Sequence, residues 1–421
     1  MAGLLITGAT LADGTRTDLL VRGGVFRDPA EATASDERLD ADGLLALPGF
    51  VDPHTHLREP GREDAETVAS GTLAAARGGF TAVHAMANLS PVTDTGERAS
   101  TLAAIAKRDA SAQVVVIGAI TRGLAGEELA DIEGLHAAGV TMFSDDGRCV
   151  MNAQLMREAF DRVKAFDGVL AQHCQDHTMA GASACCHECS VSDELGLPGW
   201  PSVAESSIVA RDVELAAYTG ARYHACHIST AESVEVIRWA KRRGLPVTAE
   251  VMPHHLLLGT PLLRTGDTVY KVNPPLRTDE HIEAVREALA DGTIDMVGTD
   301  HAPHAAQDKA KPFPQASPGM IGLEQALGVV LETMVAPGRL TWAEVADRMS
   351  YAPARLTRLA GQGRPVAVGE PANLALVDPS VRATVDREAT ASKSRNNPYA
   401  GLTLPDPVVA TLWAGRVTYR R

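Results

Sequence analysis

The sequence has no long hydrophobic run and contains few aromatic residues. Hydrophobic residues make up 45% of its 421 positions, but aromatic residues make up only 4%. No stretch approaches the run of about 18 apolar residues that a membrane-spanning helix needs, so we expect no membrane segment. The N-terminus lacks a basic segment ahead of a long apolar core, and we therefore expect no signal peptide.

Positive charge and ordered cysteine spacing are also lacking. The chain has 39 Lys and Arg against 53 Asp and Glu, a net charge of -14. This excess of negative charge would repel a phosphate backbone and argues against nucleic acid as a partner. The six cysteines do not follow the spacing of a disulfide framework. Reduced thiols in the cytoplasm are the expected state.

What the sequence does contain is an alternation of short apolar runs with helical patterns. The apolar runs cover residues 47–51, 81–86, 114–117, 140–143, 169–172, 222–226, 246–251 and 294–298. The helical patterns cover residues 66–77, 97–107, 127–137, 152–163, 202–218, 230–242, 279–290 and 323–333. Eight β-then-α units predict an α/β fold of the (β/α)₈ barrel type. A doubly wound open sheet is the alternative, but no Gly-x-Gly-x-x-Gly follows an early strand.

The two ends of the chain have a different pattern, with short apolar runs between Gly, Asp and Thr turns. Such runs lie at residues 4–6, 19–21, 24–26 and 44–47, and again at 372–377 and 408–412. Because chain termini often lie close together, we expect both ends to form one small β-sandwich domain. The expected division is residues 1–48 and 361–421 for this domain and 49–360 for the barrel.

Residues of the kind that bind metals follow five of the eight predicted strands. His54 and His56 alternate onto the same face of a strand. The full set of candidates is His54, His56, Asp146, His173, His227 and Asp300. A single histidine at a strand end would ordinarily be structural, and two surface histidines would explain His-x-His alone. Six such residues at the mouth of one barrel instead predict a site for one or two zinc ions.

Asp145 and Asp146 are adjacent, and both follow the fourth predicted strand. We favour Asp146 as the ligand and expect Asp145, which points to the other side, to cap or brace the loop. His254 and His255 follow the seventh run, and we interpret them as structural or supporting residues because the set of six is already complete.

Several motifs resemble those of the dihydroorotase family in the amidohydrolase superfamily. The two main signatures are Pro-His-Thr-His-Leu-Arg-Glu-Pro-Gly at 53–61 and Asp-His-Ala-Pro-His at 300–304. Further similarity lies at residues 75–81, 195–201, 271–277 and 319–324, so the resemblance runs nearly end to end. It implies a zinc-dependent, reversible ring closure of N-carbamoyl-L-aspartate to dihydroorotate, the third step of pyrimidine synthesis.

The resemblance also implies how the ligands are divided. His54, His56 and Asp300 would hold one metal, His173 and His227 the second, and Asp146 would bridge. Many relatives use a carboxylated lysine as the bridge, but this chain has no lysine between Lys107 and Lys164. It is therefore similar to the branch of the family that has an aspartate at this position.

For the substrate, the resemblance implies a second set of residues. These are His56, Arg58, Asn88, Asn273, His304, Pro318 and Gly319. Arg58 would grip the substrate carboxylate through two parallel hydrogen bonds, although it could instead pair with Glu59 or Glu63. Asn273 would lie against the ring, and Pro318 and Gly319 would contribute backbone contacts.

The implied chemistry is ordinary metal-assisted hydrolysis. Zinc lowers the pKa of a bound water to about 7 and polarises the carbonyl. Asp300 can take the proton of this water and pass it to the ring nitrogen. In the closing direction the same groups act in reverse.

Two other functions are consistent with the family. One is another cyclic-amide hydrolase, such as a hydantoinase or allantoinase, which would need the bridging lysine and lack Arg58 in this setting. The other is a non-catalytic partner of aspartate transcarbamoylase, but such proteins have lost metal ligands that this chain keeps. The resemblance also allows a homodimer, and an association of the active enzyme with aspartate transcarbamoylase.

Two loops are not accounted for by the metal-binding and substrate residues. Residues 183–190 contain Cys185, Cys186, His187 and Cys189, which could bind an extra metal or be redox-active. We favour a cysteine-rich loop without function, because no second cysteine pair lies near in the sequence. Residues 305–317 are polar and follow His304, and we expect them to form a loop over the site.

Overall fold

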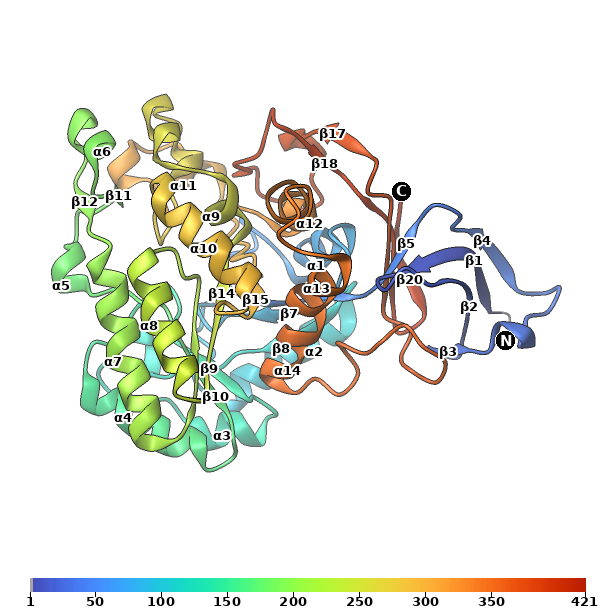
Figure 1. Ribbon diagram of the computed structural model, residues 1–421. Coiled ribbons are helices and arrows are strands. Elements are labelled where there is room, and N and C mark those ends of the chain that lie inside the picture. The colour runs from blue at the N-terminus through green and yellow to red at the C-terminus, as the bar shows by residue number, and fades with distance from the viewer. Residues whose placement is uncertain (1–2) are drawn as a thin grey trace.

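The computed structural model describes residues 3–421, which form two parts (Figure 1). The larger part is an α/β barrel, and the smaller is a β domain in which strands from both ends of the chain lie together. This is the predicted fold class.

The barrel strands fall in the eight predicted runs. Their bounds are β6 (Phe50–Thr55), β7 (Phe80–Ala85), β8 (Gln113–Val116), β9 (Met142–Ser144), β10 (Val169–Gln172), β13 (Arg222–Ala225), β14 (Val247–Val251) and β15 (Met296–Val297). They pair in parallel as β6-β7-β8 and as β9-β10-β13-β14-β15. Parallel bridges Gly118 to Phe143 and Thr55 to His301 connect the two groups and close the barrel.

Helices follow the strands and cover the outside of the barrel (Figure 1). The main ones are α1 (Val68–Arg77), α2 (Gly96–Asp109), α3 (Ile132–Ala137), α4 (Ala153–Lys164), α7 (Val203–Thr219), α8 (Ala231–Arg242), α10 (Asp279–Asp291) and α12 (Ala326–Val330). We expected the third helix over residues 127–137, but it begins only at Ile132. Asp131 sets this start, because its side chain caps the N-terminus of the helix by accepting a hydrogen bond from Gly134 N.

Shorter elements fill the connections. They are α5 (His177–Ala180), β11 (Cys186–His187), α6 (Ser190–Leu195), β12 (Gly199–Trp200), α9 (Pro253–Leu257), α11 (Ala306–Lys309), α13 (Trp342–Ala346) and α14 (Ala352–Thr357). Most of them lengthen the loops that leave the carboxyl ends of the strands, where the candidate site residues also lie.

The β domain is organised around β1 (Leu4–Leu11). Its first half pairs with β4 (Glu37–Asp40) and its second half with β5 (Leu45–Pro48), while β2 (Arg16–Arg22) pairs along its other edge. The sheet continues through β3 (Val25–Arg27), β16 (Leu374–Val377), β19 (Val408–Trp413) and β20 (Arg416–Arg420). The sheet encloses an apolar core that includes Ile6, Phe26, Leu374 and Leu412.

The sequence analysis missed β4 and β20, and also the pair β17 (Arg382–Thr384) and β18 (Thr403–Pro405). In β4 only Leu39 is buried, and β20 has no fully buried residue. Strands that bury so little show no apolar run, so hydrophobic periodicity does not detect them.

A C-terminal segment crosses from the β domain onto the active-site end of the barrel. Ser394 Oγ donates to Ala65 O at 2.7 Å and to His304 O at 2.9 Å. Asn396 Nδ2 donates to Ala302 O at 2.9 Å and to Gly319 O at 3.0 Å. These bonds tie residues 394–396 to the loop after the first strand and to the loop after the eighth strand.

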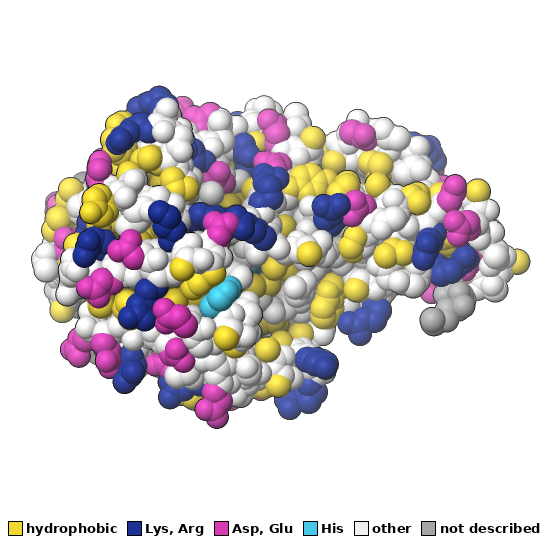
Figure 2. Space-filling view, turned by 90° about the horizontal axis from the view of Figure 1, so that it is seen from below, with side chains coloured by type: hydrophobic (Ala, Val, Ile, Leu, Met, Phe, Trp, Pro, Cys, Tyr) yellow, Lys and Arg dark blue, Asp and Glu magenta, His cyan; other side chains and the backbone are white. Residues whose placement is uncertain are grey.

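The face of the molecule drawn in Figure 2 carries charged side chains of both signs among hydrophobic ones. On this face, acidic and basic side chains are interspersed rather than segregated. No helix in residues 3–421 combines the length and the apolar character needed to cross a bilayer.

The packing of α1 against the barrel predicts a stability difference between two glycine substitutions. A Cβ at Gly78 would lie 2.2 Å from Leu323 O, whereas one at Gly361 would meet nothing within 4 Å. Gly78→Ala should therefore lower the free energy of unfolding by about 1–3 kcal/mol through overpacking. Gly361→Ala is the control and should change it little. Urea unfolding of both variants measures the difference, and equal midpoints would contradict this packing.

Candidate metal centre and active site

The two histidines that follow the first strand face two carboxylates. His56 Nε2 lies 2.9 Å from Asp300 Oδ1 and 3.3 Å from Asp146 Oδ2. His54 Nε2 lies 3.3 Å from Asp146 Oδ1 and 3.5 Å from Asp300 Oδ1. The ligand atoms of these four buried residues lie within 4.8 Å of one another, so they could share one ion.

A second group adjoins the first through Asp146. Asp146 Oδ1 lies 3.3 Å from His227 Nε2 and 3.6 Å from His173 Nδ1. His173 Nδ1 and His227 Nε2 are 2.9 Å apart. The structure thus brings together all six residues singled out as ligands, and Asp146 belongs to both groups.

The donor set fits divalent cations. Buried His54 Nε2 makes no hydrogen bond to any of residues 3–421, although it faces two carboxylates. Imidazole nitrogens and carboxylate oxygens together are typical zinc ligands, and a carboxylate common to both groups can bridge two ions.

The electrostatics keep both carboxylates ionised. Burial by itself would raise the pKa of Asp146, but contacts with His54, His173 and His227 bring it well below its usual value. Burial likewise opposes ionisation of Asp300, and His54 and His56 outweigh it, so its pKa is also lowered. Ionised carboxylates are the form that binds a cation.

The backbone is strained at two of the candidate ligands and at the nearby Arg58. Arg58, His227 and Asp300 have φ values of 60°, 37° and 43°. They are three of seven non-glycine residues with positive φ in residues 3–421. Such conformations cost energy and persist where the surrounding contacts enforce them, as they commonly do at functional sites.

Glu250, which the sequence analysis missed, orients the first ligand. It lies within β14 and is completely buried. Its Oε1 is 2.6 Å from His54 Nδ1 and accepts from His227 N at 3.3 Å, and its Oε2 is 3.2 Å from His224 Nε2. Burial would raise the pKa of Glu250, but His54 and His224 lower it. The sequence signal was an acidic residue inside the apolar run 246–251, because an unpaired buried charge is too costly to occur without a partner.

The two asparagines named as substrate residues contact the ligand histidines. Asn88 Oδ1 is 2.9 Å from His56 Nδ1. Asn273 Nδ2 donates to Gln175 Oε1 at 3.0 Å and lies 3.4 Å from His173 Nε2. Gln175 Oε1 is itself 2.9 Å from His173 Nε2. Both asparagines therefore lie at the rim of the cluster, next to the outer nitrogen of a ligand.

Arg58 lies beside the cluster, and no carboxylate in residues 3–421 forms an ion pair with it. Its Nε donates to Pro303 O at 3.0 Å. Glu59 caps Val68 N and Glu63 accepts from Gly61 N, so neither pairs with Arg58. Burial lowers the pKa of Arg58 to about 10, while the charges of Asp300 and Asp146 oppose the shift. The guanidinium remains positive and available to an anion.

His304 and the 318–319 segment contact each other on the same side of the cluster as Arg58, which bonds to the carbonyl of Pro303. His304 Nε2 is 2.7 Å from Pro318 O, and His304 N donates to Asn396 Oδ1 at 3.3 Å. Burial, together with the positive charges of Arg58 and Lys309, holds the pKa of His304 well below its usual range. Gly319 has a φ of 147°, and a Cβ there would come within 2.6 Å of His304 Nε2. The close approach of this backbone to His304 therefore requires glycine.

Asp145 braces a loop, as expected. Its Oδ1 accepts from Ile120 N at 2.8 Å and from Thr121 N at 2.9 Å. His254 and His255 are buried and lie outside the metal-binding groups found among residues 3–421. His255 Nε2 is 3.2 Å from Pro274 O.

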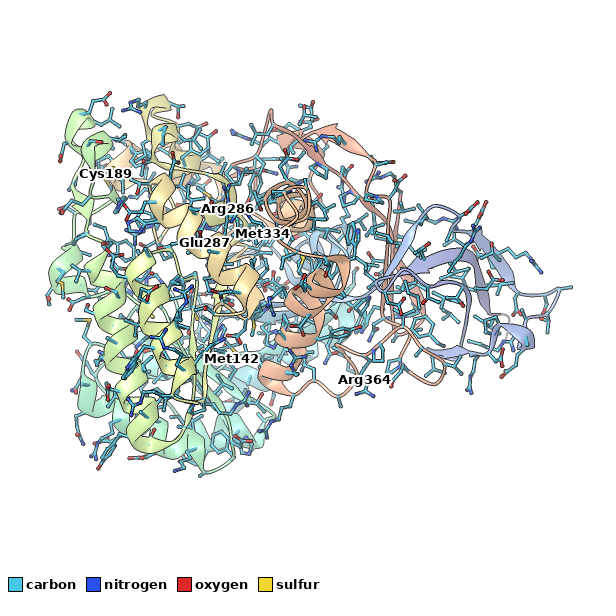
Figure 3. All side chains as sticks on the ribbon, viewed as in Figure 1. Met142, Cys189, Arg286, Glu287, Met334 and Arg364 are labelled. Atoms are coloured by element: carbon cyan, nitrogen blue, oxygen red, sulfur yellow. The ribbon has the colours of Figure 1, made fainter. Side chains whose placement is uncertain are left out.

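The cysteine-rich loop packs as a small apolar cluster. Cys185 and Cys186 are buried with Val191 and Leu263, and Cys189 packs against them. Figure 3 places Cys189 at the outer end of the barrel beside α6. None of the three belongs to a metal-binding group in the described residues, and all six cysteines of the chain are free thiols.

A closed (β/α)₈ barrel with a histidine–aspartate cluster at the carboxyl ends of its strands has the architecture of the amidohydrolase class. Solved structures agree with this class. The L-hydantoinase (dihydropyrimidinase) of Arthrobacter aurescens matches with a TM-score of 0.89 and 25% identity, over 100% of this chain and 96% of that one. The dihydropyrimidinase of Brevibacillus agri matches with a TM-score of 0.86 at 24% identity, covering 99% and 95%.

Sequence comparisons identify the family. A dihydro-orotase-like family model matches residues 43–233. The dihydroorotase of Streptomyces coelicolor is 53% identical over 99% of this chain and 98% of its own length. The dihydroorotase of Mycobacterium tuberculosis is 48% identical, over 97% and 96%. The chain belongs to the dihydroorotase family.

The contact between Glu250 and His54 predicts an effect on metal affinity. Glu250→Gln keeps the shape but removes the charge that orients His54, and such changes typically weaken metal binding about 10–100-fold. Competition with a chelator measures this affinity. Glu235→Gln, an exposed position on α8, serves as the control and should match the wild type. Equal zinc affinity in both variants would contradict the orienting role of Glu250.

Proposed function

We propose that the six-residue cluster carries out the dihydroorotase reaction, in which N-carbamoyl-L-aspartate closes to dihydroorotate with loss of water, within pyrimidine synthesis. One observation carries this proposal. Two groups of ligands share Asp146, and the unpaired guanidinium of Arg58 lies beside them. A metal-binding site next to a free cation suits a cyclic amide that bears a carboxylate.

Zinc, as one or two ions, is the proposed cofactor. His54, His56, Asp300 and Asp146 would hold one ion, and His173, His227 and Asp146 the other. Bound cations would supply Lewis acidity, which polarises the amide carbonyl and makes the attacking water more acidic. Proton transfer and substrate binding would be carried out by side chains of the protein.

Asp300 is the proposed proton carrier. Its Oδ1 is engaged with His56, while its Oδ2 makes no hydrogen bond to any of residues 3–421. Because its pKa is lowered, Asp300 is ionised and can accept a proton at Oδ2. In ring opening it would take the proton from the attacking water and deliver it to the ring nitrogen as the amide bond breaks. In ring closure it would return that proton to the departing water.

Arg58 is proposed to bind the substrate carboxylate. An arginine fork can form two parallel charge-assisted hydrogen bonds to a carboxylate. Asn88 and His304 would complete this side of the pocket, with Asn273 against the ring and backbone contacts from Pro318 and Gly319. The Arg58 contact would distinguish dihydroorotate from uncharged cyclic amides.

A hydantoinase activity is the second candidate, because the structural neighbours named above are hydantoinases. Arg58 argues against it, since the hydantoin ring carries no carboxylate to pair with a buried guanidinium. Hydrolysis of dihydroorotate together with failure to open hydantoin would support the first proposal, and the reverse pattern would support the second.

Replacing Asp300 tests the proton transfer. Asp300→Asn keeps the size of the side chain but removes the base, so kcat for dihydroorotate hydrolysis should fall by about 10²–10⁴-fold. Metal content must be measured on the same samples, because Asp300 is also a proposed ligand. Asp308→Asn, in the following loop, is the matched control. Near-normal turnover of Asp300→Asn would refute the assignment.

Replacing Arg58 tests carboxylate recognition. Arg58→Met should raise KM for dihydroorotate by about 10–100-fold, because a charge-assisted pair contributes roughly 1.5–3 kcal/mol. Slow turnover of dihydrouracil, which lacks the carboxylate, should be little affected. Arg62→Met removes a nearby arginine that is 46% exposed and pairs with Asp64 and Asp308, and it should behave like the wild type. An unchanged kcat/KM in Arg58→Met would show that the carboxylate is held elsewhere.

A further inference from the structure

The loop after the eighth strand is docked onto the chain that precedes Asn273. This loop contains α11 and the 3₁₀ turn Phe313–Gln315, and it ends at Pro318 and Gly319. It lies against the turn Thr268–Tyr270 and Lys271. Gly319 N donates to Lys271 O at 2.9 Å, which joins the two segments directly.

Lys309 gathers the two segments around its ammonium group. Its Nζ donates to Ser317 O at 2.9 Å, to Gly319 O at 3.2 Å and to Lys271 O at 3.2 Å. The backbone of the same residue is also fixed, because Thr268 Oγ1 donates to Lys309 O at 2.5 Å. Lys309 is therefore bonded to both sides of the contact between the loop and the chain before Asn273.

The charges around Lys309 do not neutralise it. No carboxylate in residues 3–421 forms an ion pair with its Nζ. Lys271 lies close and repels it, while its own Nζ donates to Pro314 O at 2.8 Å. Asp267 attracts Lys309 but also lies 3.7 Å from Arg387 NH2. On the remaining side is His304, whose ring bonds to Pro318 O. Carbonyl dipoles are thus the main partners of the ammonium.

We propose that Lys309 is a positioning residue, whose ammonium fastens the Pro318–Gly319 segment to Lys271 and so sets the width of the substrate pocket. This inference rests on the proposed function only in so far as Pro318, Gly319 and Asn273 contact the substrate. Lys309 itself touches neither the metal-binding cluster nor the reacting atoms. It acts through the backbone that it holds.

The number of donors makes this fastening sensitive to pH. An ammonium group has three N–H donors, one for each of the three carbonyls, whereas a neutral amine has two. Burial, followed by repulsion from Lys271, lowers the pKa of Lys309 to about 7. The complete set of three bonds is therefore present below this pKa and is lost as the pH rises through it. The contact of His304 with Pro318 O would loosen at the same time, because this carbonyl belongs to the segment that Lys309 holds.

Amide hydrogen exchange of the peptide containing Gly319 tests the proposal without using activity. Rates are corrected for the intrinsic pH dependence at about pH 6 and about pH 8.5, on either side of the Lys309 pKa and well below that of an ordinary lysine. In the wild type, protection should fall about fivefold to tenfold at the higher pH, the scale expected for one lost hydrogen bond. Lys309→Met should show the lower protection at both pH values, because only the bond from Gly319 N to Lys271 O remains. Lys309→Arg, which stays charged, should show the higher protection at both.

Lys311→Met is the matched control, because Lys311 lies in the same loop and its side chain is 50% exposed. It should follow the wild type. Protection in the wild type that does not change with pH, or full protection in Lys309→Met, would overturn the proposal. If Lys309→Met does not fold, the comparison between the wild type and Lys309→Arg still decides.

Steady-state kinetics separate this proposal from the proposed function. At about pH 6, Lys309→Met should raise KM for dihydroorotate by about fivefold to tenfold, the scale of one hydrogen bond, while kcat changes less than twofold. Lys309→Arg should restore KM. A loss confined to kcat would contradict a positioning role. If the wild type itself does not hydrolyse dihydroorotate, the proposed function is wrong. The hydrogen-exchange experiment still tests the positioning role of Lys309, because it does not depend on activity.

Discussion

The centre of the molecule depends on one carboxylate that faces four imidazoles. Asp146 Oδ1 lies 3.3 Å from both His54 and His227, and Oδ2 lies 3.3 Å from His56. Buried this deeply, a carboxylate without positive partners would be strongly destabilising. The cluster therefore requires cations, which bound metals or protonated histidines can supply. This requirement is consistent with polar residues from the ends of five separate strands meeting around Asp146.

Around this centre, other buried acids hold the strands in register. Asp52 accepts from His54 N at 3.0 Å and from Thr299 N at 3.1 Å, which joins the first strand to the eighth. Glu66 binds His301 and accepts hydrogen bonds from Ser392 Oγ and Lys393 N, so the C-terminal segment is anchored to the same region. Each acid satisfies several donors at once, as a buried carboxylate must. The positive φ values of His227 and Asp300 are sustained by contacts of this kind.

The sequence predicted the barrel because most of its strands are buried on both sides and form apolar runs. It brought the candidate ligands together because strand ends converge in this fold. It did not predict β4, whose buried surface is limited to Leu39. Nor could it predict that Ser394 and Asn396 would lie against the loop of His304, because no periodic pattern records a contact between residues about 90 positions apart. Glu250 lay inside a predicted strand, and its meaning depended on His54, a partner that is distant in sequence.

Fold and specificity have separate origins in this chain. The barrel architecture is shared with hydantoinases, so it cannot by itself select dihydroorotate. In the proposed function, selection would depend on what surrounds the cluster: the charge of Arg58 and the Pro318–Gly319 backbone, which are linked through Pro303 and His304. That backbone has little side-chain packing of its own, since Gly319 has no side chain and Pro318 is exposed. Its position must be enforced by neighbouring side chains, and Lys309, Lys271 and Asn396 are the groups whose bonds converge on it.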